Sequence, residues 1–240
     1  MRHSGNAREL GFRIGGLRSV RVRRVLEPGG CRSILRPMLV AAKIPPVSIE
    51  QYLAIERSAE NKSEYHDGRI VAMAGGTGPH SQLAVRIAGA LDRATAGRGC
   101  HVFNSDMKLR IRENNRVCYP DISGLCGRPE YLDETRDVFL NPSFIVEVLS
   151  RSTEAFDRGR KLALYMALPS VIEIALVSVE EVRVDKYTRQ PDGIWRFDAY
   201  SGTESEVPFS SLRCGVSLRE AYDGVDLDPP GLEPGTGKFY

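Results

Sequence analysis

Two acidic side chains stand in stretches whose other residues predict buried β-strands. Residues 144–149 are β-branched or apolar except for Glu147. Asp121 lies in a second apolar run and directly follows Pro120. A proline within a strand favours an edge, a bulge or a strand end, where a side chain can point into a cleft. A buried carboxylate without a partner is costly, so each must be paired, protonated or bound to a metal ion.

A hard divalent cation is the partner that best suits two carboxylates on neighbouring strands. Mg²⁺ is usually bound through one or two carboxylates, while water and substrate phosphate fill its remaining positions. We therefore predict that Asp121 and Glu147 hold Mg²⁺ or Mn²⁺. The alternative is a structural pair of carboxylates that forms salt bridges with Arg110 or Lys161.

Lys161 is the cation that the sequence directs toward these carboxylates. In a helix, positions 161, 164, 165 and 168 share one face. Leu164, Tyr165 and Leu168 make that face apolar, so we expect it to pack inward. A long cationic side chain at the start of this stripe can reach over the sheet to the strand ends. The alternative is an ordinary surface lysine.

Hydrophobic periodicity and turn residues predict an α/β domain whose strands are flanked by helices at both ends. Ser48 and Gln51 have the spacing of a capping box at the start of a first helix, and Asp67-Gly68 predicts a tight hairpin turn. The other predicted elements are a helix at 80–96, strands at 107–112, 117–125 and 144–149, a helix at 153–168, a strand at 171–177, a hairpin at 182–187 and 194–200, and a short helix from Ser217. We expect the strands to form one central mixed sheet.

Charge is unevenly distributed along the chain. Residues 1–37 contain nine arginines and two glutamates, a net charge of +7, whereas the whole chain has a formal net charge of +2. Three interpretations of this basic segment are open: a nucleic-acid-binding arm, a transit peptide, or a segment upstream of a true start at Met38. We expect residues 1–44 to be a disordered extension, residues 45–224 the folded domain, and residues 225–240, which are rich in proline and glycine, a disordered tail.

Composition argues against membrane, zinc and disulfide-rich proteins. Hydrophobic residues make up 42% of the chain, but no segment approaches the roughly 20 consecutive apolar residues of a membrane-spanning helix. The five cysteines are scattered without a C-x-x-C pair, which predicts neither a zinc site nor a disulfide framework. We expect a soluble protein of the reducing cytoplasm.

The order and spacing of several short blocks resemble the Uma-type restriction endonucleases of bacteria, a family of the PD-(D/E)xK nuclease superfamily. The resemblance extends from about Ser48 to Tyr222. Its blocks are Glu64 with Asp67-Gly68, His80, Ser105-Asp106, Tyr119-Pro120-Asp121, Val146 to Ser150, Ser152-Thr153, Asp157-Arg158-Gly159, Lys161 and Tyr165. One position departs from the superfamily pattern, because Leu149 stands two residues after the acid, where a lysine is usual. Lys161 on the following helix fits the missing role.

This resemblance implies a restriction-endonuclease-like core and metal-dependent hydrolysis of DNA. Asp121, Glu147 and the main-chain carbonyl of Val148 would bind Mg²⁺, and Lys161 would hold the attacking water or stabilise charge on the phosphate oxygens. A homodimer would provide two sites for two DNA strands, although the sequence reveals no interface. Two other functions stay open: a catalytically weak nuclease fold that binds nucleic acid, and a protein-interaction domain.

Three further members of these blocks are weaker site candidates. The resemblance gives His80 a role in phosphate contact or proton transfer, against a helix-start histidine satisfied by nearby backbone. Asp106 is either a supporting acid or the cap of a strand end. Glu64 is either another acid beside the metal or a solvated charge. The alternating cations Lys108, Arg110 and Arg112 are expected to form a solvated sheet face, with a phosphate track as the alternative.

Overall fold

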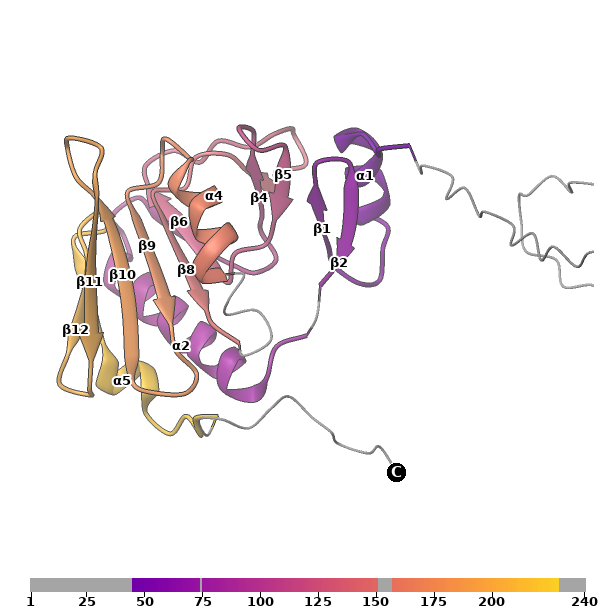
Figure 1. Ribbon diagram of the computed structural model, residues 1–240. Helices are drawn as coiled ribbons and strands as arrows, with labels where there is room; N and C mark the ends of the chain where they lie inside the picture. The colour runs from indigo at the N-terminus through magenta and orange to yellow at the C-terminus, as the bar shows by residue number, and fades with distance from the viewer. Residues whose placement is uncertain (1–44, 74, 151–156, 229–240) are drawn as a thin grey trace, which may run out of the picture. The chain divides into compact units, whose positions relative to one another are not determined.

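The computed structural model describes residues 45–73, 75–150 and 157–228, which fold into short strands and a few helices (Figure 1). The N-terminal extension, the end of the C-terminal tail and the first residues of the helix predicted at 153–168 lie outside these ranges, as does the block Ser152-Thr153. Those predictions therefore stay predictions.

The largest layer is a mixed six-stranded sheet with the order β11-β10-β9-β8-β6-β3. Its only parallel pair among the described strands is β8 with β9, and the other neighbours are antiparallel. The strands are β3 (Cys100–Asn104), β6 (Ile122–Cys126), β8 (Phe144–Val148), β9 (Glu173–Val177), β10 (Arg183–Arg189) and β11 (Trp195–Ser201). The predicted α/β class with a central mixed sheet is confirmed.

Helices cover both faces of this sheet (Figure 1). The predicted helix at 80–96 is α2 (Gly78–Thr95), and its Leu83, Ile87 and Leu91 pack in one core with Val146 and Val148 of β8. On the opposite face, α4 (Leu162–Met166) packs against Ile145 of β8. Because side chains alternate along a strand, Glu147 shares its face with Ile145 and points to the side of α4.

A second sheet has five strands in the order β2-β1-β5-β4-β7. The strands are β1 (Ser63–His66), β2 (Arg69–Ala72), β4 (Lys108–Ile111), β5 (Arg116–Cys118) and β7 (Val138–Phe139). The predicted Asp67-Gly68 turn joins β1 to β2, and both of its residues have positive φ. The predicted Ser48–Gln51 capping box begins α1 (Ile49–Glu56), whose Tyr52 and Leu53 pack on this sheet.

A small hairpin and a helix complete the fold. Strands β12 (Glu206–Phe209) and β13 (Cys214–Ser217) form a two-stranded sheet that the sequence did not predict. The Ser217 hydroxyl then accepts the backbone N–H of Glu220 and begins α5 (Leu218–Tyr222), as expected. Among the described helices, none has the length and apolar character needed to cross a membrane.

The prediction of one strand over 117–125, and with it one sheet, is wrong. The chain leaves the five-stranded sheet at Cys118, the end of β5, and enters the six-stranded sheet at Ile122, the start of β6. Pro120 lies between them and has no backbone N–H for either ladder. Asp121 therefore lies at the crossing between two sheets rather than in mid-strand.

The prediction of no disulfide is also wrong. Cys100 and Cys126 are cross-strand partners in β3 and β6, and their sulfur atoms are bonded. The two cysteines are 26 residues apart. No local sequence motif predicts this disulfide, because only the register of β3 and β6 brings the two cysteines together.

Candidate active site

The crossing between the sheets fixes Asp121 beside the end of β8. Ile122 pairs with Val146, so the next position in the antiparallel register brings Asp121 opposite Glu147. The Oδ2 atom of Asp121 accepts the backbone N–H of Val148 at 2.8 Å. The same oxygen lies 3.2 Å from Nε2 of His80 at the start of α2. The end of β8 and the start of α2 thus both hold this carboxylate.

Glu147 is buried and paired. Only 4% of its side chain is exposed, and its Oε1 lies 2.8 Å from Nζ of Lys161. The hydroxyl of Tyr165 donates to the same oxygen at 2.5 Å. The salt bridge with Lys161 is compatible both with a structural role and with a catalytic role of Glu147.

Lys161 ends a single π-helical turn, Asp157–Lys161, which runs directly into α4. Such turns are uncommon and are often found at functional sites. Arg158 in this turn donates to Oδ2 of Asp185 at 2.6 Å, and Asp185 is buried on β10. The ion pair ties the turn to the six-stranded sheet and so fixes the starting point of the Lys161 side chain.

The interpretation of Glu64 as a solvated charge is wrong, because this residue is only 9% exposed. Its strand pairs with β5, which ends next to the crossing. Burial by itself raises the pKa of Glu64, but the hydrogen bond with His66 at 2.7 Å and the charge of Lys161 bring the pKa below its usual value. Glu64 is therefore an ionised acid on the Lys161 side of the site.

Asp121 also stays ionised at neutral pH. Burial raises its pKa, whereas the hydrogen bond with His80, the charges of His80 and Lys161 and the N–H of Val148 lower it, and the lowering dominates. Lys161 thus acts electrostatically on Asp121 as well as on Glu147, to which it is directly paired.

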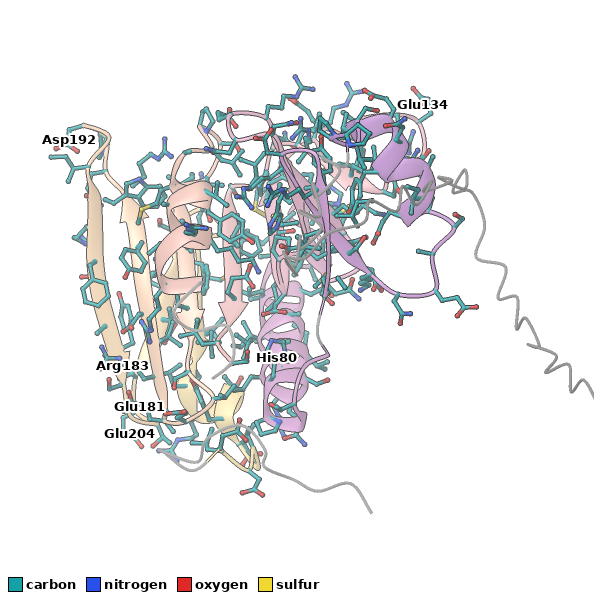
Figure 2. The ribbon with its side chains drawn as sticks, turned by 45° about the vertical axis from the view of Figure 1, so that its right-hand side comes forward. His80, Glu134, Glu181, Arg183, Asp192 and Glu204 are labelled. Atoms are coloured by element: carbon teal, nitrogen blue, oxygen red, sulfur yellow. A yellow bond between two sulfur atoms is a disulfide. The ribbon has the colours of Figure 1, made fainter. Side chains whose placement is uncertain are left out.

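His80 lies in the first turn of α2, where Figure 2 labels it. Its backbone N–H donates to the Thr77 hydroxyl at 3.4 Å, so the cap satisfies the main chain. The imidazole is left for Asp121 and is 19% exposed. A Cβ atom on Gly76 would lie only 2.8 Å from Nδ1 of His80. The glycine therefore leaves room for the ring in this position.

Asp106 lies away from the buried carboxylates. Its side chain is 75% exposed and pairs with Nζ of Lys62 at 2.6 Å. Its backbone N–H donates to the side chain of Asn104, so Asn104 and not Asp106 closes this strand end. Lys62 also donates to the carbonyl of Ser105. The four residues form a polar rim.

An open groove of about 700 Å³ leads from this rim to Asp121 and His80. One wall is the face of α2 that carries Ala84, Val85 and Ala88. The lining outside α2 includes the polar residues Asn61, Lys62, Asn104 and Ser105. A substrate in the groove would meet apolar side chains of α2, hydrogen-bonding groups and the ionisable residues Asp121 and His80.

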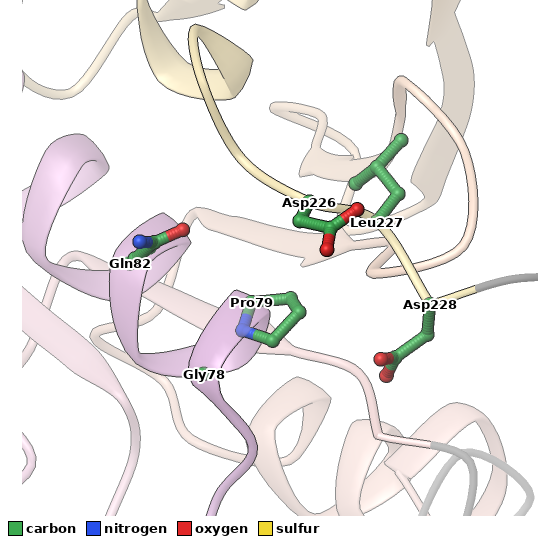
Figure 3. A pocket seen from close by; sticks show the side chains of 6 residues that line it. All are labelled: Gly78, Pro79, Gln82, Asp226, Leu227 and Asp228. Carbon is green, nitrogen blue, oxygen red and sulfur yellow. The ribbon is translucent and has the colours of Figure 1, made fainter.

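A second hollow, of about 570 Å³, adjoins the start of α2 (Figure 3). Pro79 and Gln82 line it on the helix, and Asp226 and Asp228 line it on the chain segment after α5. Neither carboxylate is matched by a cation among the six lining residues. The two carboxylates disfavour an anionic substrate here, whereas the groove of about 700 Å³ has Lys62 and His80 in its lining beside Glu60 and Asp121.

The expected solvated cationic face of β4 is largely absent. Lys108 is buried and lies 3.1 Å from Asp137. Arg110 donates to the carbonyls of Ile111 and Arg116. Only Arg112 is exposed. Lys108 and Arg110 are therefore already bonded to other groups of the protein, which also argues against a phosphate track.

Among the described residues, no three His, Cys, Asp or Glu side chains form a ready-made metal cage. Asp121 and Glu147 supply two carboxylates at neighbouring strand ends, which is the number that Mg²⁺ usually takes from a protein. The donor chemistry therefore fits a hard cation that keeps several water ligands.

Several contributors escaped the sequence analysis. Tyr165 belongs to the family blocks and to the apolar helix face, but neither pattern predicts that its hydroxyl donates to Glu147. Asp185 is an acid within a predicted strand, the same local anomaly that singled out Glu147. His66 and Lys62 gave no local signal, because strand pairing and loop packing bring them to the site.

Comparisons with known proteins agree with this architecture. A family model named Uma2 and described as "Putative restriction endonuclease" matches residues 49–221. Two uncharacterized Synechocystis proteins, slr1290 and sll1609, are 37% and 31% identical over 77% and 73% of this chain, and 96% and 99% of their own lengths. The crystal structure of a putative nuclease belonging to DUF820 from Anabaena variabilis has a TM-score of 0.60 and 19% identity, and the match covers 74% of this chain and 98% of that one. That likeness supports the fold.

Proposed function

Because the chain belongs to the Uma2 family of putative restriction endonucleases, we propose that it is a divalent-metal-dependent endonuclease that hydrolyses DNA phosphodiester bonds. The family resemblance read from the sequence blocks is confirmed, and membership implies a nuclease-like function. One observation supports the finer proposal most. Asp121 and Glu147 lie at neighbouring strand ends, where His80 pairs with Asp121 and Lys161 pairs with Glu147.

Asp121, Glu147 and the main-chain carbonyl of Val148 are the groups that would hold Mg²⁺ or Mn²⁺. When bound, such a metal polarises the scissile phosphate and lowers the pKa of a coordinated water. The carboxylate of Asp121 is ionised at neutral pH, as a metal ligand must be. Its Oδ2 is already oriented by Val148 and His80, so the ligand is preorganised.

Lys161 supplies the positive charge of the proposed mechanism. Its ammonium group lies against Glu147 and acts electrostatically on Asp121 and Glu64. From there it would orient the attacking water or stabilise negative charge on the phosphate oxygens. The Tyr165 hydroxyl donates to the same Oε1 of Glu147 that Lys161 contacts and helps to orient this carboxylate.

His80 and Glu64 act as supporting residues in this scheme. His80 holds Asp121 and lines the groove, where its ring can contact substrate phosphate. Glu64 balances the charge of Lys161 on the buried side. Asp106 has a lesser role, because it orients Lys62 at the rim.

Plasmid DNA incubated with the full chain and Mg²⁺ or Mn²⁺ tests the proposal. We expect cleavage that requires the metal, and we expect Glu147→Gln to reduce the rate by at least about a hundred-fold, because a metal ligand and the partner of Lys161 are lost together. Glu134→Gln is the matched control, since Glu134 is exposed and remote from the site in Figure 2. It should leave the rate unchanged.

The same experiment separates the alternatives. DNA retention without cleavage, equal in the chain and in Glu147→Gln, would indicate a nuclease fold that only binds nucleic acid. A lack of DNA affinity at low salt would favour a protein-interaction domain. Metal-dependent cleavage that persists in Glu147→Gln would move the active site elsewhere. RNA in place of DNA, in parallel reactions, tests the choice of nucleic acid.

A further inference from the structure

Among the described strands, β11 is an edge of the six-stranded sheet. It pairs with β10 along all seven of its residues, Trp195–Ser201, and it is the terminal strand in the sheet order. Figures 1 and 2, which differ by a 45° turn, both show it on the outside. Proteins usually protect such an edge with charged side chains, especially lysine, or with a proline, a bulge or a very short strand. Trp195–Ser201 contains no proline, lysine or bulge, and its two charged residues, Arg196 and Asp198, pair with each other.

The side chains at this edge are partly apolar and carry one charge of each sign. Phe197 at the centre of the strand is 50% exposed, and Ile194, which directly precedes the strand, is 65% exposed. Arg196 and Asp198 flank Phe197 and point to the opposite face of the sheet. They form an ion pair of 2.8 Å within the chain. Two copies of this strand that run in opposite directions would therefore place a positive residue of each copy opposite a negative residue of the other.

We propose that β11 pairs with β11 of a second copy of this chain, antiparallel, around a twofold axis at Phe197. In this register Arg196 lies opposite the partner's Asp198, and Asp198 lies opposite the partner's Arg196. The two Phe197 rings meet at the axis, where aromatic pairs across strands are stabilising. The six-stranded sheets of both copies join into one continuous sheet, and every exposed backbone group of the edge gains a partner.

Neighbouring registers are disfavoured by charge. An axis at Arg196 sets arginine opposite arginine, and an axis at Asp198 sets aspartate opposite aspartate, both of which are destabilising. An axis at Trp195 or Ala199 leaves neither charge opposite its complement. Residues that lie opposite each other in an antiparallel pair also have their side chains on the same face of the sheet. An axis that passes between two adjacent residues would pair side chains from opposite faces, so such registers do not occur. The axis at Phe197 is the one that satisfies all of these constraints.

A second copy of this chain is favoured over an unrelated peptide as the partner, because β11 itself carries both charges, Arg196 and Asp198, that the pairing requires. This interface lies outside the groove and does not depend on the proposed nuclease function. Its test therefore measures assembly and not activity.

Charge reversal tests the register through the mass of the full chain in sedimentation. We expect the wild-type chain to be dimeric, Arg196→Asp and Asp198→Arg each to weaken the dimer at least about ten-fold, and the double reversal to restore it. Glu204→Arg is the control, since the Glu204 side chain is 82% exposed and pairs with Arg219 outside β11, and this substitution should leave the dimer intact. A monomeric wild-type chain, or a dimer unaffected by either single reversal, overturns the proposal.

Cysteine cross-linking provides a second readout that does not depend on weakening the protein. In a background that lacks Cys31 and the partly exposed Cys214, Phe197→Cys should form a disulfide-linked dimer on mild oxidation, because position 197 faces itself across the axis. Ala199→Cys on the same face should not, since its two copies lie four residues apart along the strand. Cross-linking of Ala199→Cys but not of Phe197→Cys contradicts the register.

Discussion

At the scale of single residues, each acid at the centre of the site has a basic side chain beside it. Glu147 pairs with Lys161, Asp121 with His80, and Glu64 with His66. Local reasoning anticipated the first two acids, because a carboxylate within an apolar run or after a proline is anomalous. It failed for Glu64, whose burial depends on the pairing of β1 with β5, some fifty residues away in sequence.

The position of His80 yields a prediction at Gly76. A methyl group there would lie 2.8 Å from Nδ1 and 3.2 Å from Cγ of His80, so Gly76→Ala should displace the imidazole from Asp121. We expect the rate of metal-dependent DNA cleavage to fall about ten-fold to a hundred-fold, with little change in thermal stability. Single-turnover kinetics and a melting curve measure the two effects.

Gly75→Ala is the control for this prediction. A Cβ atom at Gly75 meets nothing within 4 Å, so the substitution adds the same methyl group without touching the ring. Equal losses in both variants would show that the loop before α2 matters for its flexibility and not for the room it leaves to His80.

At the scale of elements, the site lies where short segments from two sheets meet. Helix α2 and hairpin β1–β2 could be predicted because their signals are local: periodic Leu83, Ile87 and Leu91 in the first, Asp67-Gly68 in the second. The division of 117–125 into β5 and β6 could not, because the sequence is largely apolar on both sides of Pro120 and a proline is also compatible with a bulge or an edge within one strand. Only the pairing partners distinguish the two strands, because β5 pairs with β1 and β4, whereas β6 pairs with β3 and β8.

Asp137 ties three elements together and makes a pH-dependent contribution to stability. It accepts hydrogen bonds from Arg57 at the end of α1 and from Lys108 of β4, and it directly precedes β7. The bond with Arg57 is the largest cause that lowers its pKa from 3.8 to about 2. Because the folded-state pKa is below the unfolded value, the contribution is complete above about pH 4 and is lost as the pH falls toward 2.

We therefore expect Asp137→Asn to reduce the free energy of unfolding by about 1 to 2 kcal/mol at pH 7, after allowance for partial solvent screening. The difference from the unmodified chain should shrink as the pH falls from 4 to 2. Urea unfolding across this range measures it. Asp92→Asn on the exposed side of α2 is the control. A difference that is independent of pH would mean that shape, not charge, explains the loss.

At the scale of the whole chain, the charge is divided between two regions. The net charge of +2 combines +7 in residues 1–37 with an acidic remainder. Within the described residues, most cations near the site are already paired with protein carboxylates, as Lys62, Lys108 and Lys161 are. A DNA substrate would thus gain little long-range attraction from the folded domain, and the arginines of the first 37 residues are the largest remaining source.

If these arginines contact phosphates, they should determine how steeply DNA affinity depends on salt. Each phosphate contact contributes about 0.9 to the slope of log affinity against log salt concentration, through the release of condensed counterions. We expect a full-length variant with all nine arginines of residues 1–37 changed to glutamine to have a slope shallower by several units. Its cleavage rate on saturating DNA should be unchanged, because Asp121, Glu147 and Lys161 are intact. Fluorescence anisotropy at several salt concentrations measures the slope, and equal slopes for both proteins would exclude this segment from DNA binding.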